Sequence, residues 1–148
     1  MKFIVLAILC FFGLIQIYAQ NKAKNEEYTQ NLMQDSCIFS TTGWNTFFIL
    51  EIGYQQTLQG IEGKDTTTLI ITVLNETKKI GNVETRIIEE KEMVNSKPIE
   101  ISRNYFAFCK QTSSIYYFGE DVDMYKDGKV ISHEGAWIAE GKNKSGVQ

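Results

Sequence analysis

From Cys37 onward, runs of β-branched and aromatic residues alternate at short intervals with turn sequences. Residues 66–74 (TTTLIITVL) have the strongest β propensity in the chain and are expected to form a central strand. Asp127-Gly128 is the type of two-residue turn that joins the strands of a hairpin. Short strands separated by tight turns are typical of antiparallel sheets. We therefore predict an all-β fold: a single antiparallel sheet that is strongly curved or closed into a small barrel.

One segment of this pattern is ambiguous. In residues 83–94 (VETRIIEEKEMV), Val83, Ile87 and Val94 fit a helical stripe, whereas Val83, Thr85 and Ile87 alternate as in a strand. We favour a strand because the neighbouring segments are predicted strands. Residues 99–109 place apolar side chains on both faces, so this part of the sheet is expected to be covered on both sides. The other predicted strands are residues 45–50, 54–58, 115–118, 136–138 and a hairpin at 123–131.

The N-terminus has the pattern of a secretory signal peptide. Lys2 precedes an apolar run at residues 3–17, and Ala19 supplies the small residue expected before a cleavage site. The run is shorter than the roughly 20 residues that a spanning helix requires. We predict cleavage after Ala19, a polar tether at 20–36, a β domain at 37–140 and a flexible tail at 141–148. The mature protein is expected in the periplasm or outside the cell, with no transmembrane segment.

The charge balance argues against nucleic-acid binding. Fifteen Lys and Arg residues and eighteen Asp and Glu residues give a net charge of −3. A protein that binds nucleic acid usually carries a basic patch that neutralises phosphates. We therefore expect no nucleic-acid partner.

Two cysteines, Cys37 and Cys109, remain after the predicted cleavage. Exported proteins with an even number of cysteines commonly form disulfides, so we predict a Cys37–Cys109 bond. In the chain-entropy model, closing a loop of this length stabilises the fold by about 4 kcal/mol. The alternative is a pair of separately buried thiols. Cys109 follows an apolar run, which is not the electropositive, partly open setting of a catalytic thiol.

Residues 101–139 resemble a family of exported bacterial proteins with no assigned function. The resemblance rests on the run YFGEDVD at 117–123, YKDGKV at 125–130 and HEG-x-W at 133–137. It extends weakly through residues 43–48 and 83–86, and so covers most of the mature chain. It implies export but no particular chemistry. In such proteins further strands follow the Gly-Trp segment, which leaves open whether this sequence is a shortened member; a shortened member would expose a sheet edge that favours dimerisation or aggregation.

The acidic residues near the C-terminus form a candidate calcium site. Counted from Asp123, the segment DMYKDGKVISHE places Asp127 at the fifth position and Glu134 at the twelfth, as in a calcium-binding loop, with Asp121 close by. Tyr125 occupies the third position, where an oxygen ligand is needed, and no amphipathic helices flank the loop. The alternative is an acidic hairpin around Asp127-Gly128. Apart from this calcium, no cofactor is predicted.

No convergent catalytic set is evident. His133 is the only histidine, and a hydrolase that combined it with Ser132 or Ser102 would lack the Gly-x-Ser-x-Gly motif. Carboxylates that are candidates for paired acid and base chemistry also fit solvated strand faces: Glu89, Glu90, Glu92, Asp121 and Asp123. We expect no catalytic residues.

Aromatic residues make up 12% of the chain, and most are expected to build the core. We predict an exported, non-enzymatic β-domain that acts as a binding or envelope-associated module for an unknown protein partner. The alternative is a carrier of an apolar small molecule or lipid in a β-sheet pocket. Its ligand-binding residues are not identified by the sequence. The aromatic residues considered are Trp44, Phe47, Phe48, Tyr54, Tyr105, Phe106, Phe108, Tyr116, Tyr117, Phe118, Tyr125 and Trp137.

Overall fold

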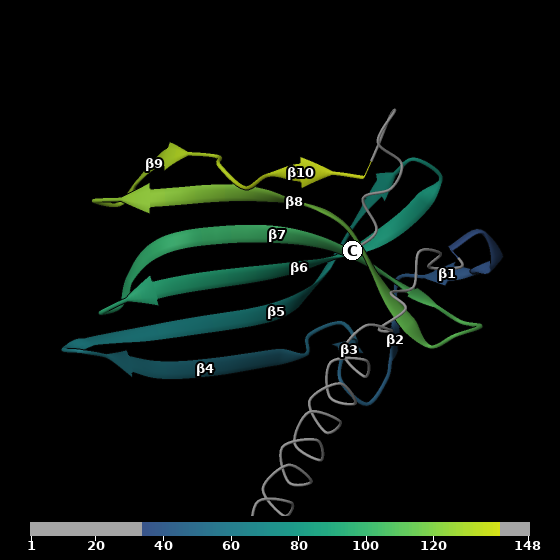
Figure 1. Cartoon of the computed structure of the whole chain (residues 1–148), viewed down its shortest axis with the longest axis horizontal. Helices are drawn as coiled ribbons and strands as arrows, with labels where there is room; N and C mark the ends of the chain where they lie inside the picture. The colour runs from purple at the N-terminus through teal and green to yellow at the C-terminus, as the bar shows by residue number, and fades with distance from the viewer. Residues whose placement is uncertain (1–33, 140–148) are drawn as a thin grey trace, which may run out of the picture. The chain divides into compact units, whose positions relative to one another are not determined.

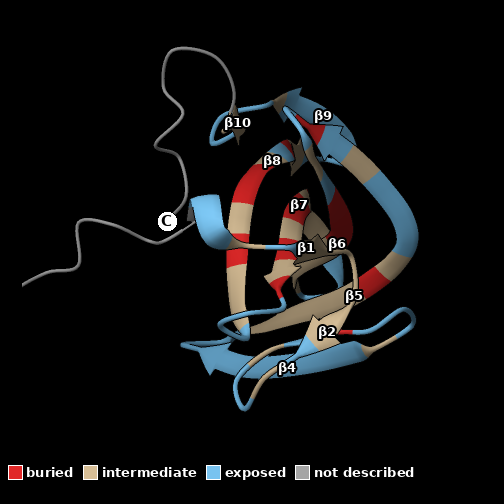
Figure 2. Ribbon diagram, turned by 90° about the vertical axis from the view of Figure 1, so that its right-hand side faces the viewer, coloured by how far each residue is buried: buried red, intermediate tan, exposed pale blue. Residues whose placement is uncertain are grey.

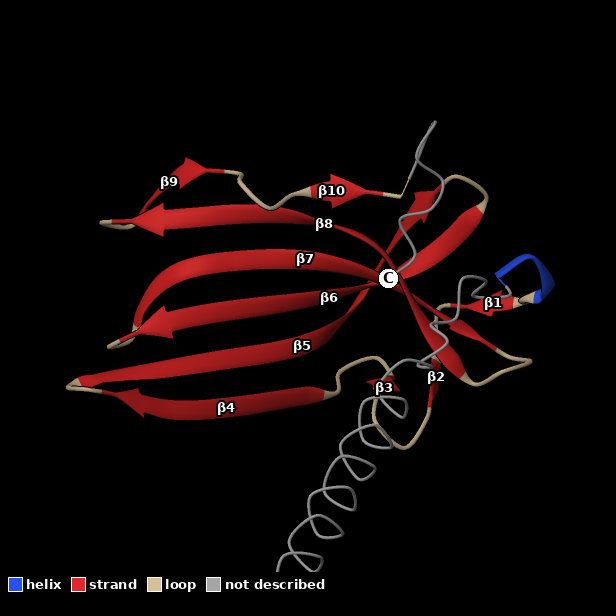
Figure 3. Cartoon of the chain, in the orientation of Figure 1, coloured by secondary structure: helices blue, strands red, loops and turns tan. Residues whose placement is uncertain are grey.

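The computed structural model describes residues 34–139, and this part of the chain is built from β-strands with one short 3₁₀ turn (Figure 3). The prediction of an all-β, antiparallel fold is confirmed. The predicted signal peptide, most of the tether and the tail lie outside the described residues. The elements are η1 (Gln34–Ser36), β1 (Phe39–Ser40), β2 (Gly43–Trp44), β3 (Ile49–Leu50), β4 (Gln55–Glu62), β5 (Asp65–Ile80), β6 (Val83–Val94), β7 (Lys97–Cys109), β8 (Ser114–Lys126), β9 (Lys129–Ser132) and β10 (Trp137–Ile138).

Successive hairpins form one large sheet in the order β10-β8-β7-β6-β5-β4, with β1 paired to β7 and β9 to β8 (Figure 1). The predicted barrel, or strongly curved sheet, is wrong: the sheet is open and not strongly curled. Closure requires its first and last strands to pair along their length. One of these, β10, has only two residues, and β4 at the other edge is exposed along all eight of its residues.

Several strands are longer than the sequence predicts. The predicted strand at 115–118 and the first arm of the 123–131 hairpin are parts of one strand, β8. The segment between the strands predicted at 54–58 and 66–74 is reduced to a two-residue turn, because Glu62 already pairs with Asp65. By contrast, only Ile49 and Leu50 of the strand predicted at 45–50 are paired in β3. The ambiguous segment at 83–94 is a strand, and Asp127-Gly128 forms the predicted turn with positive φ at both residues.

An irregularity between Val73 and Thr77 interrupts the pairing of β5 with β6. The side chain of Arg86, which is only 5% exposed, lies at this irregularity. Its guanidinium donates to the backbone oxygens of Leu74 and Glu76, both at 3.3 Å. It also donates to Thr41, at 3.0 Å to the backbone oxygen and 3.2 Å to the hydroxyl. Arg86 therefore satisfies the carbonyls that the bulge releases and ties the N-terminal segment to the sheet.

The sheet buries apolar residues on both faces, as expected for its second half. The buried residues are concentrated in β6, β7 and β8 (Figure 2). We call one side the disulfide face; its cluster includes Ile87, Tyr105, Ala107 and Cys109. We call the other side the pocket face; its cluster includes Val73, Ile88, Phe106 and Phe108. The two-stranded β2–β3 hairpin packs on the pocket face through Leu50, which is fully buried in the same cluster.

A row of aromatic rings crosses the pocket face. Phe48 lies 5.1 Å from Phe106, Phe106 stacks on Tyr117 at 4.6 Å, and Tyr117 meets Trp137 edge-on at 5.0 Å, all measured between ring centroids. Next to this row, a side chain at Gly43 would collide with the Phe108 ring, since an added Cβ would lie 2.4 Å from it. Glycine at this position therefore lets the β2–β3 hairpin approach the sheet closely.

Residues 34–139 include no helix with the length and apolar character needed to cross a bilayer.

Candidate functional site

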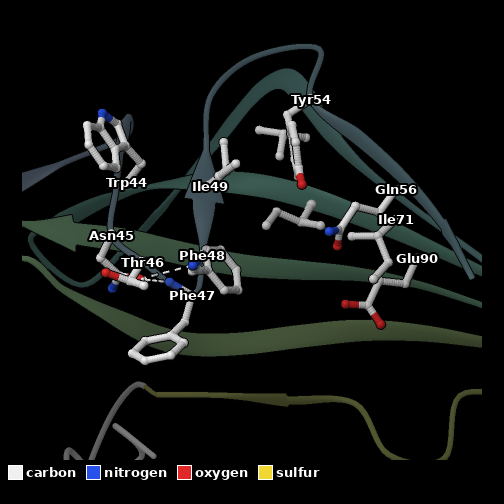
Figure 4. A pocket seen from close by; sticks show the side chains of 12 residues that line it. Trp44, Asn45, Thr46, Phe47, Phe48, Ile49, Tyr54, Gln56, Ile71 and Glu90 are labelled. Carbon is white, nitrogen blue, oxygen red and sulfur yellow. Dashed lines mark hydrogen bonds between the residues drawn. The ribbon is translucent and has the colours of Figure 1, made fainter.

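A pocket of about 450 Å³ lies between the β2–β3 hairpin and the pocket face of the sheet (Figure 4). Pockets of this size are common small-molecule sites. The lining is mainly apolar and aromatic, with two polar side chains from the sheet, Gln56 and Glu90. The lining residues are Trp44, Asn45, Thr46, Phe47, Phe48, Ile49, Tyr54, Gln56, Ile71, Val73, Ile88 and Glu90.

Strand register explains the floor of the pocket. Val73 of β5 pairs with Ile88 of β6, which gives an apolar base. Two residues further along β5, Ile71 pairs with Gln56 of β4 on one side and with Glu90 of β6 on the other. Because paired residues project to the same face, Gln56 and Glu90 flank Ile71 at one end of the pocket (Figure 4).

Asn45 shapes the hairpin that covers the pocket. Its side-chain oxygen accepts hydrogen bonds from the backbone N–H groups of Phe47 and Phe48, both at 2.9 Å. Its side-chain nitrogen donates to the backbone oxygen of Ser113 at 2.9 Å, in the turn between β7 and β8. This Asx-type turn replaces most of the strand predicted at 45–50 and holds the pocket wall in place.

The hairpin exposes large apolar side chains beside the pocket. Trp44 is 68% exposed and Phe47 is 93% exposed. Ile49 and Ile52 on the same segment are also exposed. Single exposed apolar residues are ordinary, but a group of them at the mouth of an apolar pocket is typical of an interaction site.

The electrostatics of the pocket face are dominated by carboxylates. Burial raises the pKa of Glu90, and the charges of Glu120 and Glu100 raise it further. Burial also raises the pKa of Glu100, as do the charges of Glu92 and Glu120. Burial and the neighbouring Glu120 raise the pKa of Tyr117, so this phenol stays protonated. Proton uptake by the carboxylates, or a bound cation, relieves this repulsion.

The predicted disulfide is present. Cys37 and Cys109 are bonded, with their Cα atoms 5.2 Å apart and 72 residues apart in sequence. The bond fixes the segment before β1 to the end of β7, next to the Phe39–Cys109 pairing. Since both cysteines are bonded, neither is a free nucleophile.

Asp121, one of the four predicted calcium ligands, belongs to a network on the disulfide face. It accepts a short hydrogen bond from Tyr105 and pairs with Lys78 at 3.1 Å. The Tyr105 hydroxyl and the Lys78 ammonium hold the pKa of the Asp121 carboxyl below its ordinary value. The Lys78 ammonium also lies 4.2 Å from the centre of the Tyr105 ring. These contacts give Asp121 a structural role as the partner of Tyr105 and Lys78.

The other predicted ligands are separated. Asp123 contacts His133 at 2.9 Å, Asp127 lies in the hairpin turn, and the backbone N–H of Glu134 donates to Ser132. Within the described range, no group of three or more His, Cys, Asp or Glu side chains is placed to hold a metal ion. The calcium interpretation remains a prediction. It would be tested by the effect of calcium on the melting temperature of the wild type and of an Asp127→Ala variant.

The candidate catalytic residues are also dispersed. The His133 ring nitrogen Nδ1 approaches Asp123 and the backbone oxygen of Val122, whereas Ser102 accepts a hydrogen bond from Asn104 at 3.0 Å. Glu89 pairs with Arg103 on the disulfide face, while its neighbour Glu90 projects to the pocket face. The sequence therefore identifies Glu90 as a candidate carboxylate but does not indicate that it lines a pocket.

Fold and site together define an open antiparallel β-sheet domain with an apolar pocket under a short hairpin. Comparison with family models, with curated proteins and with solved structures gave no match. The arguments about function therefore rest on the geometry of this chain. Sequence analysis did not identify the pocket residues as a group. Its relevant observations were the abundance of aromatic residues, four of which line the pocket, and the candidate carboxylate Glu90.

Proposed function

We propose that this chain is an exported, non-enzymatic binding domain that holds an apolar small molecule or acyl chain in the pocket under the β2–β3 hairpin. The pocket itself is the observation that carries the proposal. It has an apolar floor, aromatic walls and a volume in the range of small-molecule sites. The proposed export rests on the N-terminal sequence pattern.

A binding role is favoured over catalysis by the placement of the reactive groups. Within residues 34–139, both cysteines are bonded to each other, and the one histidine contacts Asp123 instead of a serine. Nucleophilic catalysis requires a nucleophile within hydrogen-bond reach of a base. Glu90 lines the pocket without such a nucleophile beside it.

The proposal is tested by titrating the mature protein with N-phenyl-1-naphthylamine, an apolar probe that is uncharged at neutral pH and fluoresces in apolar surroundings. We expect saturable binding in the micromolar range. Replacing Phe47 by Ala should weaken binding about fivefold, since an aromatic wall is lost. Because Phe47 is 93% exposed, its removal should leave stability unchanged.

The matched control is Ile131→Ala, which removes an exposed apolar side chain from β9, outside the pocket. This variant should bind the probe as the wild type does. Absence of saturable binding to the folded wild type would overturn the proposal. Equal weakening by Phe47→Ala and Ile131→Ala would show that the probe coats the surface without entering the pocket.

A further inference from the structure

Glu90 is the carboxylate of the pocket. It projects from the middle of β6 and flanks Ile71 at the end of the pocket where Gln56 also lies (Figure 4). It forms no hydrogen bond or ion pair with another side chain of residues 34–139. An acidic group half removed from water among apolar neighbours attracts a positive charge more strongly than an exposed one does.

The same face continues beyond the pocket with further carboxylates. Register places Glu92 and Glu100 opposite each other, and it places Glu120 beside Asn104. The ion pairs of residues 34–139 join Lys78 to Asp121, Arg103 to Glu76 and Glu89, and His133 to Asp123. None of these pairs uses a carboxylate of the pocket face, so these carboxylates have no ion-pair partner among the side chains of the described region.

Lys91 follows Glu90 on β6 but alternates to the opposite face, and the nearest cation of β6 on the same face is already engaged. Arg86, two residues before Ile88 on β6, donates its hydrogen bonds to Thr41, Leu74 and Glu76 within the bulge. It is only 5% exposed and is held away from solvent. Arg86 is therefore not available to Glu90, and no ion pair of residues 34–139 includes this carboxylate.

The aromatic walls add a second attraction for positive charge. Tyr54 and Phe48 line the pocket together with Glu90. The faces of aromatic rings carry negative electrostatic potential and attract ammonium groups, more strongly where water is excluded. An alkyl chain attached to the ammonium group gains from burial over Val73 and Ile88.

From this arrangement we infer that the pocket selects apolar amines: ligands with an alkyl or aryl body in the pocket and an ammonium group beside Glu90. This inference rests on the proposed function, because it assigns a chemical class to the ligand of the same pocket. An anionic ligand such as a fatty acid is disfavoured, since its carboxylate would lie among carboxylates of the same sign.

The inference is tested with three ligands of the same chain length, octylamine, 1-octanol and octanoate, each competing with N-phenyl-1-naphthylamine at pH 7 and low salt. Octylamine is a cation under these conditions, octanol is neutral and octanoate is an anion. We expect octylamine to bind about tenfold more tightly than octanol, which corresponds to one charge-assisted contact, and octanoate to bind least. Glu90→Gln should remove the preference for octylamine over octanol.

The control variant is Glu92→Gln, which removes the same charge from the same strand and face but outside the pocket lining. It should keep most of the preference. Octanol binding as tightly as octylamine to the wild type would overturn the inference while leaving the proposed function intact. A preference that survives in Glu90→Gln would also overturn it. Failure of the probe and all three ligands to bind would overturn the proposed function itself.

Discussion

Arg86 allows the sharpest test of the architecture, because one side chain connects the bulge of β5 to the N-terminal segment. It makes four hydrogen bonds, three to backbone oxygens and one to the Thr41 hydroxyl. Methionine at this position keeps an apolar stem of similar length but donates no hydrogen bond. Arg86→Met therefore leaves the oxygens of Leu74, Glu76 and Thr41 without their donor.

The expected cost follows from the burial of these partners. A hydrogen bond from a charged donor contributes about 1.5–3 kcal/mol when its loss leaves a buried acceptor unpaired. Glu76 is exposed, and Thr41 and Leu74 are half-buried, so water replaces part of each lost interaction. The substitution also removes the buried charge of Arg86, and the desolvation energy recovered in this way offsets a further part of the lost stability. We expect Arg86→Met to lower the free energy of unfolding by about 3 kcal/mol, measured by urea denaturation at pH 7.

Arg103→Met is the matched control. Arg103 also lies in the centre of the sheet, but it forms exposed ion pairs with Glu76 at 3.2 Å and Glu89 at 3.4 Å. Surface pairs of this kind contribute less than about 1 kcal/mol. If Arg86→Met and Arg103→Met had equal effects, or if Arg86→Met stayed within about 0.5 kcal/mol of the wild type, the role assigned to Arg86 would be refuted.

Three further perturbations test other parts of the structure. Replacing both Cys37 and Cys109 by Ser should lower the free energy of unfolding by about 4 kcal/mol, because the bond closes a long loop in the unfolded chain; an unchanged urea midpoint would contradict this. Glu100→Gln should raise stability by about 0.5 kcal/mol at pH 7, since Glu100 lies directly opposite Glu92. The raised pKa of Glu100 means that the wild type gains stability as pH falls through that pKa, so the advantage of the variant should shrink on acidification in urea titrations at several pH values. Leu58→Lys on the open edge strand β4 should reduce self-association in light scattering at high protein concentration while leaving the melting temperature unchanged; equal scattering would show that this edge does not pair.

Local sequence patterns were sufficient to predict the class of the fold, since strand-forming runs and turn residues carry this information in the chain itself. They were not sufficient for strand lengths. The strand predicted at 66–74 continues to Ile80 and leaves only Gly81 and Asn82 as the turn, because Lys78 and Lys79 pair with Thr85 and Glu84 of the next strand. Pairing with a neighbour thus extends β5 through polar residues that have weak strand propensity of their own.

The candidate site was less accessible to sequence analysis because it depends on contacts between distant segments. Alternation alone separates Glu89 from Glu90, but it does not indicate which face carries a pocket. That is decided by the β2–β3 hairpin, which Asn45 anchors to the turn at Ser113, 68 residues away. The disulfide was predictable for a different reason: the two cysteines that follow the predicted cleavage site leave one pairing available.

The electrostatic character of the pocket face depends on a further feature that a regular two-residue period does not reveal. On β8, Tyr117 pairs with Phe106 and Glu120 pairs with Asn104, so both project to the pocket face although they are three residues apart. In an uninterrupted strand, residues at this odd separation would lie on opposite faces. The irregularity between them includes Gly119, whose φ is 133°, and an added Cβ there would lie 2.3 Å from the backbone oxygen of Trp137. Glycine at this position lets β10 approach β8 and lets the strand change its period. The bulge therefore places Tyr117 in the aromatic row and adds Glu120 to the carboxylates that raise the pKa of Glu90. Through Glu120, the bulge contributes to the proposed cation selectivity of the pocket.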